Sequence, residues 1–168
     1  MTIADVFTDC YGRIRDRFAR AVKGLTPEEL AWRPGPDANS IGWLLWHLTR
    51  VQDDHIAGRA GRGEVWTTEG FFERFALPFT PDATGYAHTS EEVEACRIPS
   101  AELLLEYHEA VHAATVGWIS KLDDAAFDQE IDRWRGEPVT LAVRLVSVFD
   151  DNIEHVGQAA YLRGMLGK

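Results

Sequence analysis

Apolar residues recur at helical spacing in four long stretches of the chain, with polar residues between them. In the first stretch Ile3, Val6, Ile14 and Phe18 fall near one face of a helix, and Gly24 ends the pattern. Four long helices are therefore predicted, over residues 3–23, from Asn39 or Ser40 to about Ala57, from Ser100 to about Leu122, and from about Thr140 to Met165.

The segments between these helices are richer in glycine and proline. A short helical start is predicted at residues 26–29 and a loop at 32–39, and the least regular part of the chain is 58–99. Short helical pieces are expected within the connections, at residues 68–75, 90–95 and 124–130. No stretch shows the alternation of a strand, so the prediction is an all-α fold, with residues 1–168 forming one four-helix domain. Because residues 58–99 are long enough to cross the bundle, the second and third helices can run parallel.

The charge and composition of the chain argue against nucleic acid and membrane as partners. The chain has 27 acidic and 17 basic residues and a formal net charge of −10, which repels nucleic acid and anionic lipid. No apolar run is long enough to span a bilayer, and residues 1–5 do not begin a signal peptide. The two cysteines, Cys10 and Cys96, form no C-x-x-C pair. We expect a cytoplasmic protein that acts on a small molecule, without a nucleic acid or membrane partner.

Two metal-ligating residue types stand four positions apart in the last helix, Asp151 and His155. This spacing puts both side chains on one face, one turn apart. His47 in the second helix can complete a His-Asp-His set if the two helices pack together, and three ligands leave coordination positions open, as catalytic metals require. Asp/His pairs at this spacing are also common by chance, so a solvated aspartate and a half-buried histidine explain the spacing equally well.

A competing pattern lies in the third helix. Residues 108–112 read His-Glu-Ala-Val-His, the H-E-x-x-H pattern of zinc hydrolases, in which the glutamate activates water. The longer form of the motif needs a glycine and a third histidine where this chain has Thr115 and Trp118, so that form is excluded. The other form takes a distant glutamate as third ligand, and Glu130 could serve. His108 falls near the centre of the apolar face, which favours a core histidine over a zinc ligand.

Two segments resemble the DinB-like superfamily of helical metal-binding proteins. The first is residues 39–48, Asn-Ser-Ile-Gly-Trp-Leu-Leu-Trp-His-Leu, and the second is residues 150–158, Asp-Asp-Asn-Ile-Glu-His-Val-Gly-Gln, followed by Tyr-Leu-Arg-Gly at 161–164. The family includes bacillithiol and mycothiol S-transferases and the mycothiol-dependent maleylpyruvate isomerase domain. The resemblance implies an up-down-down-up four-helix bundle, often a homodimer.

The resemblance also implies that His47, Asp151 and His155 are the metal ligands. Many relatives have histidine where this chain has Asp151. The aspartate keeps a ligand at that position but makes the site more anionic than theirs. Zinc is the first choice of metal, and nickel, iron and manganese stay open.

The function that we expect is a metal-dependent enzyme using a low-molecular-weight thiol of the mycothiol or bacillithiol type, as an S-transferase or isomerase. Asp54, two turns after His47, is a candidate proton acceptor, and Arg144 and Arg163 are candidates for holding an anionic group of the cofactor or substrate. Each of these three has the alternative of an ordinary surface residue. The alternative function is a non-catalytic metal-binding protein in stress or protein interaction, and an H-E-x-x-H zinc hydrolase is the third choice.

Overall fold

Helices dominate the structure, which is a computed structural model describing residues 1–168. Each of the four long helices follows a Ser or Thr whose side-chain oxygen accepts a hydrogen bond from the third residue of the helix. These caps fix where the helices begin. The long helices are α1 (Ile3–Val22), α3 (Ile41–Ala57), α7 (Ala101–Ile119) and α9 (Leu141–Met165).

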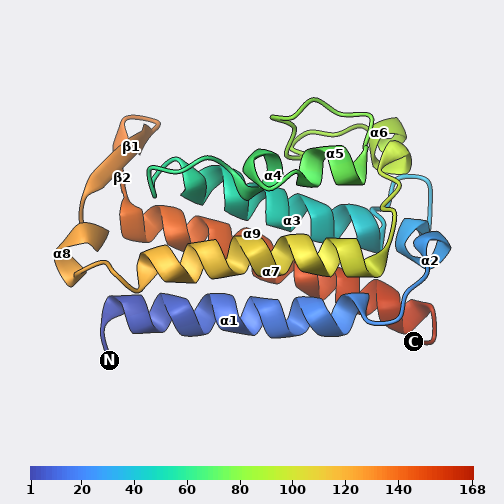
Figure 1. Ribbon diagram of the computed structural model, residues 1–168, viewed down its shortest axis with the longest axis horizontal. Coiled ribbons are helices and arrows are strands. Elements are labelled where there is room, and N and C mark those ends of the chain that lie inside the picture. The colour runs from blue at the N-terminus through green and yellow to red at the C-terminus, as the bar shows by residue number, and fades with distance from the viewer.

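The long helices pack as two layers. α3 and α9 contact each other, as do α1 and α7, and each layer also contacts the other through α1 with α9 and α3 with α7. In Figure 1, α1 and α9 run toward the end of the molecule that carries the C-terminus, and α3 and α7 run the opposite way. The residues that precede α7 therefore pass along the whole length of α3.

Short helices occupy the connections, broadly where the sequence predicted them. In place of the single helical piece expected at 68–75 there are two short helices, at 65–68 and 71–75, and Gly70 between them adopts a left-handed conformation with φ 73°. The helix expected at 124–130 ends at Phe127, and Glu130 already belongs to a strand. α7 ends at Ile119 instead of Leu122. The short helices are α2 (Pro27–Ala31), α4 (Val65–Thr68), α5 (Phe71–Phe75), α6 (Ser90–Ala95) and α8 (Asp124–Phe127).

The prediction that the chain contains no strand is wrong. β1 (Glu130–Trp134) and β2 (Glu137–Thr140) form an antiparallel hairpin immediately before α9. Its two turn residues, Arg135 and Gly136, have φ of 51° and 87°, and positive φ at both positions suits a two-residue hairpin. Arg-Gly lacks the Asn or Asp that normally marks such a turn, and the strands are too short to show an alternating pattern.

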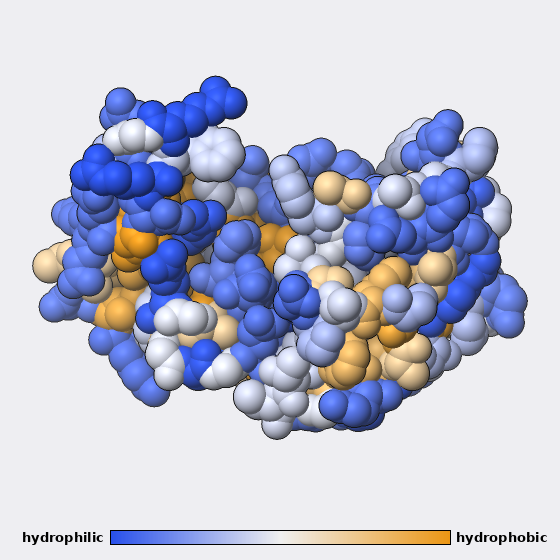
Figure 2. Space-filling model, turned by 90° about the horizontal axis from the view of Figure 1, so that it is seen from above, coloured by the Kyte–Doolittle hydropathy of each residue, from blue (hydrophilic) through white to orange (hydrophobic).

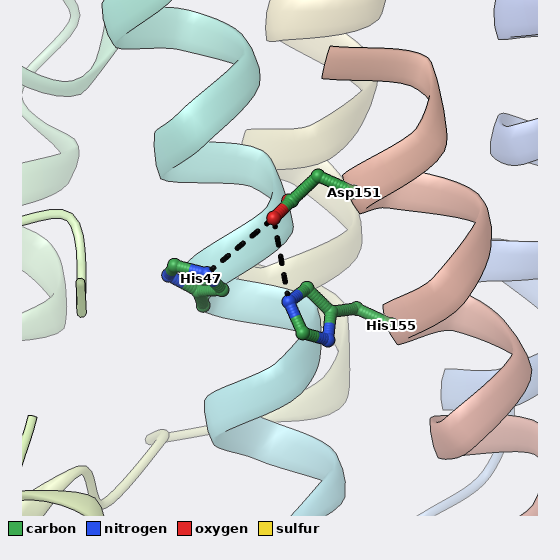
Figure 3. Close-up of side chains that lie close together, drawn as sticks. All are labelled: His47, Asp151 and His155. Atoms are coloured by element: carbon green, nitrogen blue, oxygen red, sulfur yellow. Dashed lines mark ion pairs between the residues drawn. The ribbon is translucent and has the colours of Figure 1, made fainter. Parts of the chain in front are cut away.

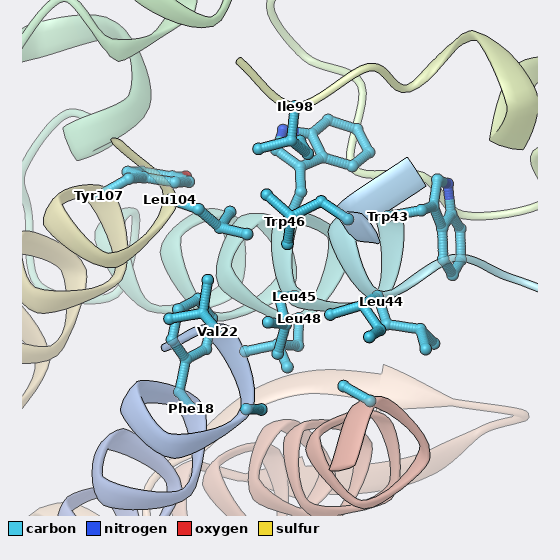
Figure 4. Close-up of a cluster of buried hydrophobic side chains, with 14 of the residues drawn as sticks. Phe18, Val22, Trp43, Leu44, Leu45, Trp46, Leu48, Ile98, Leu104 and Tyr107 are labelled. Carbon is cyan, nitrogen blue, oxygen red and sulfur yellow. The ribbon is translucent and has the colours of Figure 1, made fainter. Parts of the chain in front are cut away.

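The core is built around α3, which is buried on nearly every side. Figure 4 shows Leu45 and Leu48 of α3 meeting Phe18 of α1 and Leu104 of α7 in the main apolar cluster. A smaller cluster joins Phe7 to the α8 end of the molecule. None of the helices has the length and apolar character needed to cross a membrane.

Candidate metal centre

Three side chains converge where the middle of α3 faces α9. His47 comes from α3, and Asp151 and His155 come from successive turns of α9 (Figure 3). Asp151 Oδ1 lies 3.9 Å from His47 Nε2 and 3.5 Å from His155 Nε2. All three potential ligand atoms lie within 4.8 Å of one another, the only such group of His, Cys, Asp or Glu in the molecule.

Each histidine is oriented by a hydrogen bond at its other ring nitrogen. His47 Nδ1 lies 2.6 Å from the carbonyl oxygen of Thr84, and His155 Nδ1 lies 3.0 Å from Gln158 Oε1. The Gln158 amide in turn donates to Glu154 Oε1 at 3.1 Å. Because Nδ1 donates in both cases, each Nε2 is left with a lone pair directed at the cluster, the arrangement that metal-ligating histidines adopt. Gln158, from the segment 150–158 that resembles the family, thus orients the ring of His155.

The donor set fits a divalent cation. Asp151 Oδ2 is buried and has no hydrogen-bond partner, an expensive state for a carboxylate oxygen unless a cation compensates it. Two imidazoles and one carboxylate suit zinc, nickel, iron or manganese. Ligand atoms around a tetrahedral zinc lie about 3.4 Å apart, since each is about 2.1 Å from the metal. The separations of 3.5 and 3.9 Å are near that value.

The two histidines differ in their proton affinity. Burial lowers the pKa of His47, outweighing the Thr84 carbonyl and Asp151. Burial also opposes protonation of His155, but hydrogen bonds to Asp151 and Gln158 outweigh it and raise the pKa of His155. Asp151 thus attracts a positive charge to the centre, as either a proton on His155 or a metal ion.

A segment of the irregular region covers His47. Gly85 has φ 93°, and a Cβ added there would lie 2.8 Å from His47 Nδ1 and 3.0 Å from Trp46 Cζ3. The His47 ring also stacks on Trp43, with ring centroids 4.7 Å apart, and the same added Cβ would lie 3.2 Å from Trp43 Cζ2. Sequence reasoning missed Thr84 and Gly85, since nothing in an irregular segment indicates which carbonyl will reach a distant helix.

Buried charges on α3 hold this segment in place. The fully buried Arg50 donates through Nε to the Ala83 carbonyl at 3.0 Å and through Nη1 to Glu64 Oε2 at 2.6 Å. Asp53, also fully buried, accepts from the backbone amides of Val65 at 3.1 Å and Trp66 at 2.8 Å. The helix that carries His47 therefore also fixes the residue next to Thr84.

A cavity of about 500 Å³ adjoins the cluster and is lined by His47, Asp151, Asp54 and Arg144 among others. Asp54 is partly exposed, with its carboxylate 3.7 Å from His55 Nδ1. Arg144 Nη2 donates to Asp132 of β1 at 2.8 Å.

Arg163 lies elsewhere in the molecule, donating to the carbonyls of Ala21 at 3.2 Å and Lys23 at 2.8 Å. Asp54 and Arg144 thus line the cavity beside the cluster, whereas Arg163 lies at the end of α1.

The H-E-x-x-H residues occupy a different environment. His108 is fully buried, stacked on Phe18 with ring centroids 4.0 Å apart, and burial lowers its pKa to about 3. Glu109 faces solvent near Arg15. Glu130, the predicted third ligand, is in β1, where it pairs with Arg133. No third His, Cys, Asp or Glu joins His108 and His112.

Comparisons with known proteins identify the family and the fold of the chain. A family model described as the DinB superfamily matches residues 11–159. The crystal structure of a conserved protein from Enterococcus faecalis is 30% identical with a TM-score of 0.91, covering 100% of this chain and 99% of that one. A DinB-like protein from Bacillus cereus is 18% identical with a TM-score of 0.62, covering 99% and 93%, and shows likeness of fold alone. No curated protein matches the chain.

Proposed function

The chain belongs to the DinB superfamily, and we propose that it is a metal-dependent enzyme whose cation is held by His47, Asp151 and His155. The cation, zinc in the first instance, would activate a low-molecular-weight thiol of the mycothiol or bacillithiol type, and the reaction would be an S-transfer or an isomerisation. The observation that carries the proposal is that the Nε2 atoms of His47 and His155 and a carboxylate oxygen of Asp151 lie together, while the second oxygen of Asp151 is buried without a partner.

The chemistry follows from three ligands and an adjoining cavity. A cation with open coordination positions acts as a Lewis acid and lowers the pKa of a bound thiol or water. The protein's own residues then bind and orient the reactants. Asp54, which lines the cavity, accepts the proton that the nucleophile releases, and Arg144 holds an anionic group. Arg163 has no part in this proposal, because its guanidinium binds the carbonyls at the end of α1.

The resemblance supports three further proposals about the whole molecule. The four long helices form the family's up-down-down-up bundle, in keeping with the helix directions in Figure 1. The protein is a homodimer, and it works in the reducing cytoplasm, where its two cysteines stay free.

Metal analysis of protein purified without an affinity tag tests the site. We expect about one equivalent of metal in the parent and nearly none in His155→Ala, because two ligands hold a cation far more weakly than three. His112→Ala is the matched control, since it removes the histidine of the rival motif and should leave the metal in place. Stoichiometric metal in His155→Ala, or its loss from His112→Ala alone, would refute the assignment.

Turnover of a chlorinated nitrobenzene or bimane acceptor with each thiol tests the reaction. We expect a rate that requires both metal and thiol, that chelator abolishes and that added metal restores. Metal-loaded protein without thiol-dependent turnover would instead support a non-catalytic metal-binding protein.

A further inference from the structure

The cavity beside the metal centre has features that the metal chemistry does not use. Arg144 is only 23% exposed, and its single hydrogen bond runs from Nη2 to Asp132. Its Nε and Nη1 donors have no partner in the protein. A guanidinium presents five donors in a rigid fork that matches a carboxylate, so the unused donors can take a second acceptor.

Two aromatic side chains line the same cavity from segments far apart in the chain. Tyr86 comes from the irregular segment, directly after the Thr84–Gly85 cover of His47, and Trp134 comes from the end of β1. They are 86% and 69% exposed, so neither is explained by packing in the core. The guanidinium of Arg135 lies 5.7 Å from the centroid of the Trp134 ring. Single exposed aromatics are ordinary, but two on one cavity beside an arginine are the lining that a ligand pocket has.

The cavity continues under the hairpin. Trp134, Arg144 and Ser147 also line a second cavity, of about 580 Å³, which extends to Val139 and Val143. Arg135 and Glu137 also line this second cavity, so its lining is mixed, and Arg144 is shared by the two cavities. From above, the molecular surface is hollowed between its two raised ends (Figure 2). A ligand in the first cavity with its anionic group on Arg144 would have the aromatic side chains of Trp134 and Tyr86 in the same cavity.

We propose that this cavity binds an aromatic carboxylate, with its carboxylate on Arg144 and its ring against Trp134 and Tyr86. The proposal names the substrate class of the proposed enzyme and in that respect rests on the proposed function. The carboxylates of Asp54 and Asp151 repel an anion, so a cation at the centre strengthens binding of the ligand, and the ligand strengthens binding of the cation.

Calorimetry with an unreactive probe, 3-phenylpropanoate, tests the proposal without turnover. We expect the parent to bind it at least about tenfold more tightly than the neutral 3-phenylpropan-1-ol, since a carboxylate–arginine contact is charge-assisted. It should bind about two- to tenfold more tightly than 3-cyclohexylpropanoate, which matches its size without an aromatic ring. Equal affinity for the alcohol would overturn the carboxylate assignment, and equal affinity for the cyclohexyl acid would overturn the aromatic one.

Variants locate the probe. Arg144→Gln should weaken binding about tenfold or more, Arg144→Lys should weaken it less, and Trp134→Ala and Tyr86→Ala should each weaken it several-fold. Arg133→Gln is the control for lost charge and a lost hydrogen bond on the hairpin, because Arg133 pairs with Glu130 and donates to the Gly136 carbonyl but lines neither cavity. Tyr161→Ala is the control for an exposed tyrosine outside this cavity. Unchanged affinity in Arg144→Gln, or equal losses in the controls, would overturn the proposal.

Measuring probe binding with and without metal separates this inference from the proposed function. Binding of the probe that depends on Arg144 in both the parent and metal-free His155→Ala supports the cavity even if no thiol chemistry is found. A metal-loaded parent that turns over thiol but does not bind the probe refutes the substrate class and leaves the function intact.

Discussion

Replacing Gly85 by alanine should disturb the metal centre although residue 85 carries no ligand. The backbone there has φ 93°, and the added Cβ would lie 2.8 Å from His47 Nδ1 and 3.0 Å from Trp46 Cζ3. Positive φ costs an alanine about 1–2 kcal/mol. Both contacted atoms belong to buried rings on α3, so overpacking adds about 1–3 kcal/mol. We expect Gly85→Ala to lower the free energy of unfolding by about 2–5 kcal/mol from these two terms.

The substitution should also weaken metal binding. The segment can relieve the contact by moving away from α3, and that movement lengthens the 2.6 Å hydrogen bond from His47 to the Thr84 carbonyl. Losing the partner that orients a ligating histidine costs about 10–100-fold in metal affinity. Competition with a chelating indicator measures this loss, and urea denaturation measures stability.

Gly24→Ala is the matched control. Gly24 has φ 68° and no atom near its would-be Cβ, so it isolates the backbone cost of about 1–2 kcal/mol from the contact with His47. Metal affinity in Gly24→Ala should equal that of the parent. If Gly85→Ala binds metal as tightly as the parent and is destabilised no more than Gly24→Ala, the Thr84–Gly85 segment does not orient His47.

Three further predictions concern buried charge, pH and proton transfer. Asp53→Ala should cost about 3–5 kcal/mol of unfolding free energy in urea, because the amides of Val65 and Trp66 lose their acceptor and the buried Arg50 and partly buried Arg62 lose a counter-charge. A loss under about 1 kcal/mol would contradict the structural role of Asp53. The pKa of His108 is lowered from 6.5 to about 3, so below pH 6.5 the unfolded chain binds a proton that the folded chain does not. His108 should therefore remove up to about 1.4 kcal/mol of stability per pH unit as the pH falls from 6.5 toward 3, and His108→Gln should show a correspondingly flatter dependence in urea titrations between pH 4 and 7. Asp54→Asn should slow thiol-dependent turnover about 100-fold while retaining the metal, if Asp54 is the proton acceptor; an unchanged rate would make it a solvated surface residue.

Periodicity predicted the long helices well because each has both an apolar face and a capping Ser or Thr. The same reasoning failed at residues 130–140. Their hairpin turn is Arg135–Gly136, and its strands are held next to α9 by tertiary contacts such as Arg144 with Asp132. Local sequence carries little of that information.

The candidate ligands were found from spacing and resemblance together, whereas their surroundings were not. From spacing alone, a solvated Asp151 and a half-buried His155 explained the pattern as well as a pair of metal ligands did. The H-E-x-x-H pattern is a more specific sequence signal, but His108 is stacked on Phe18 in the core and Glu109 faces outward. Whether a second helix brings a third ligand is a tertiary property, and it separates the two motifs.

Burial of charge on α3 links the irregular segment to the metal centre. Arg50 lies one turn after His47, is fully buried, and binds the carbonyl of Ala83, next to the Thr84 carbonyl that orients His47. Burying a guanidinium costs free energy unless its donors are hydrogen-bonded. If the segment at Ala83 moved away from Arg50, a buried donor would lose its acceptor, and this cost opposes the movement. The carbonyl partner of His47 is thus held by the same helix that carries the ligand. Substitutions in residues 58–99 that leave every ligand unchanged should therefore alter metal affinity whenever they loosen the contact with Arg50.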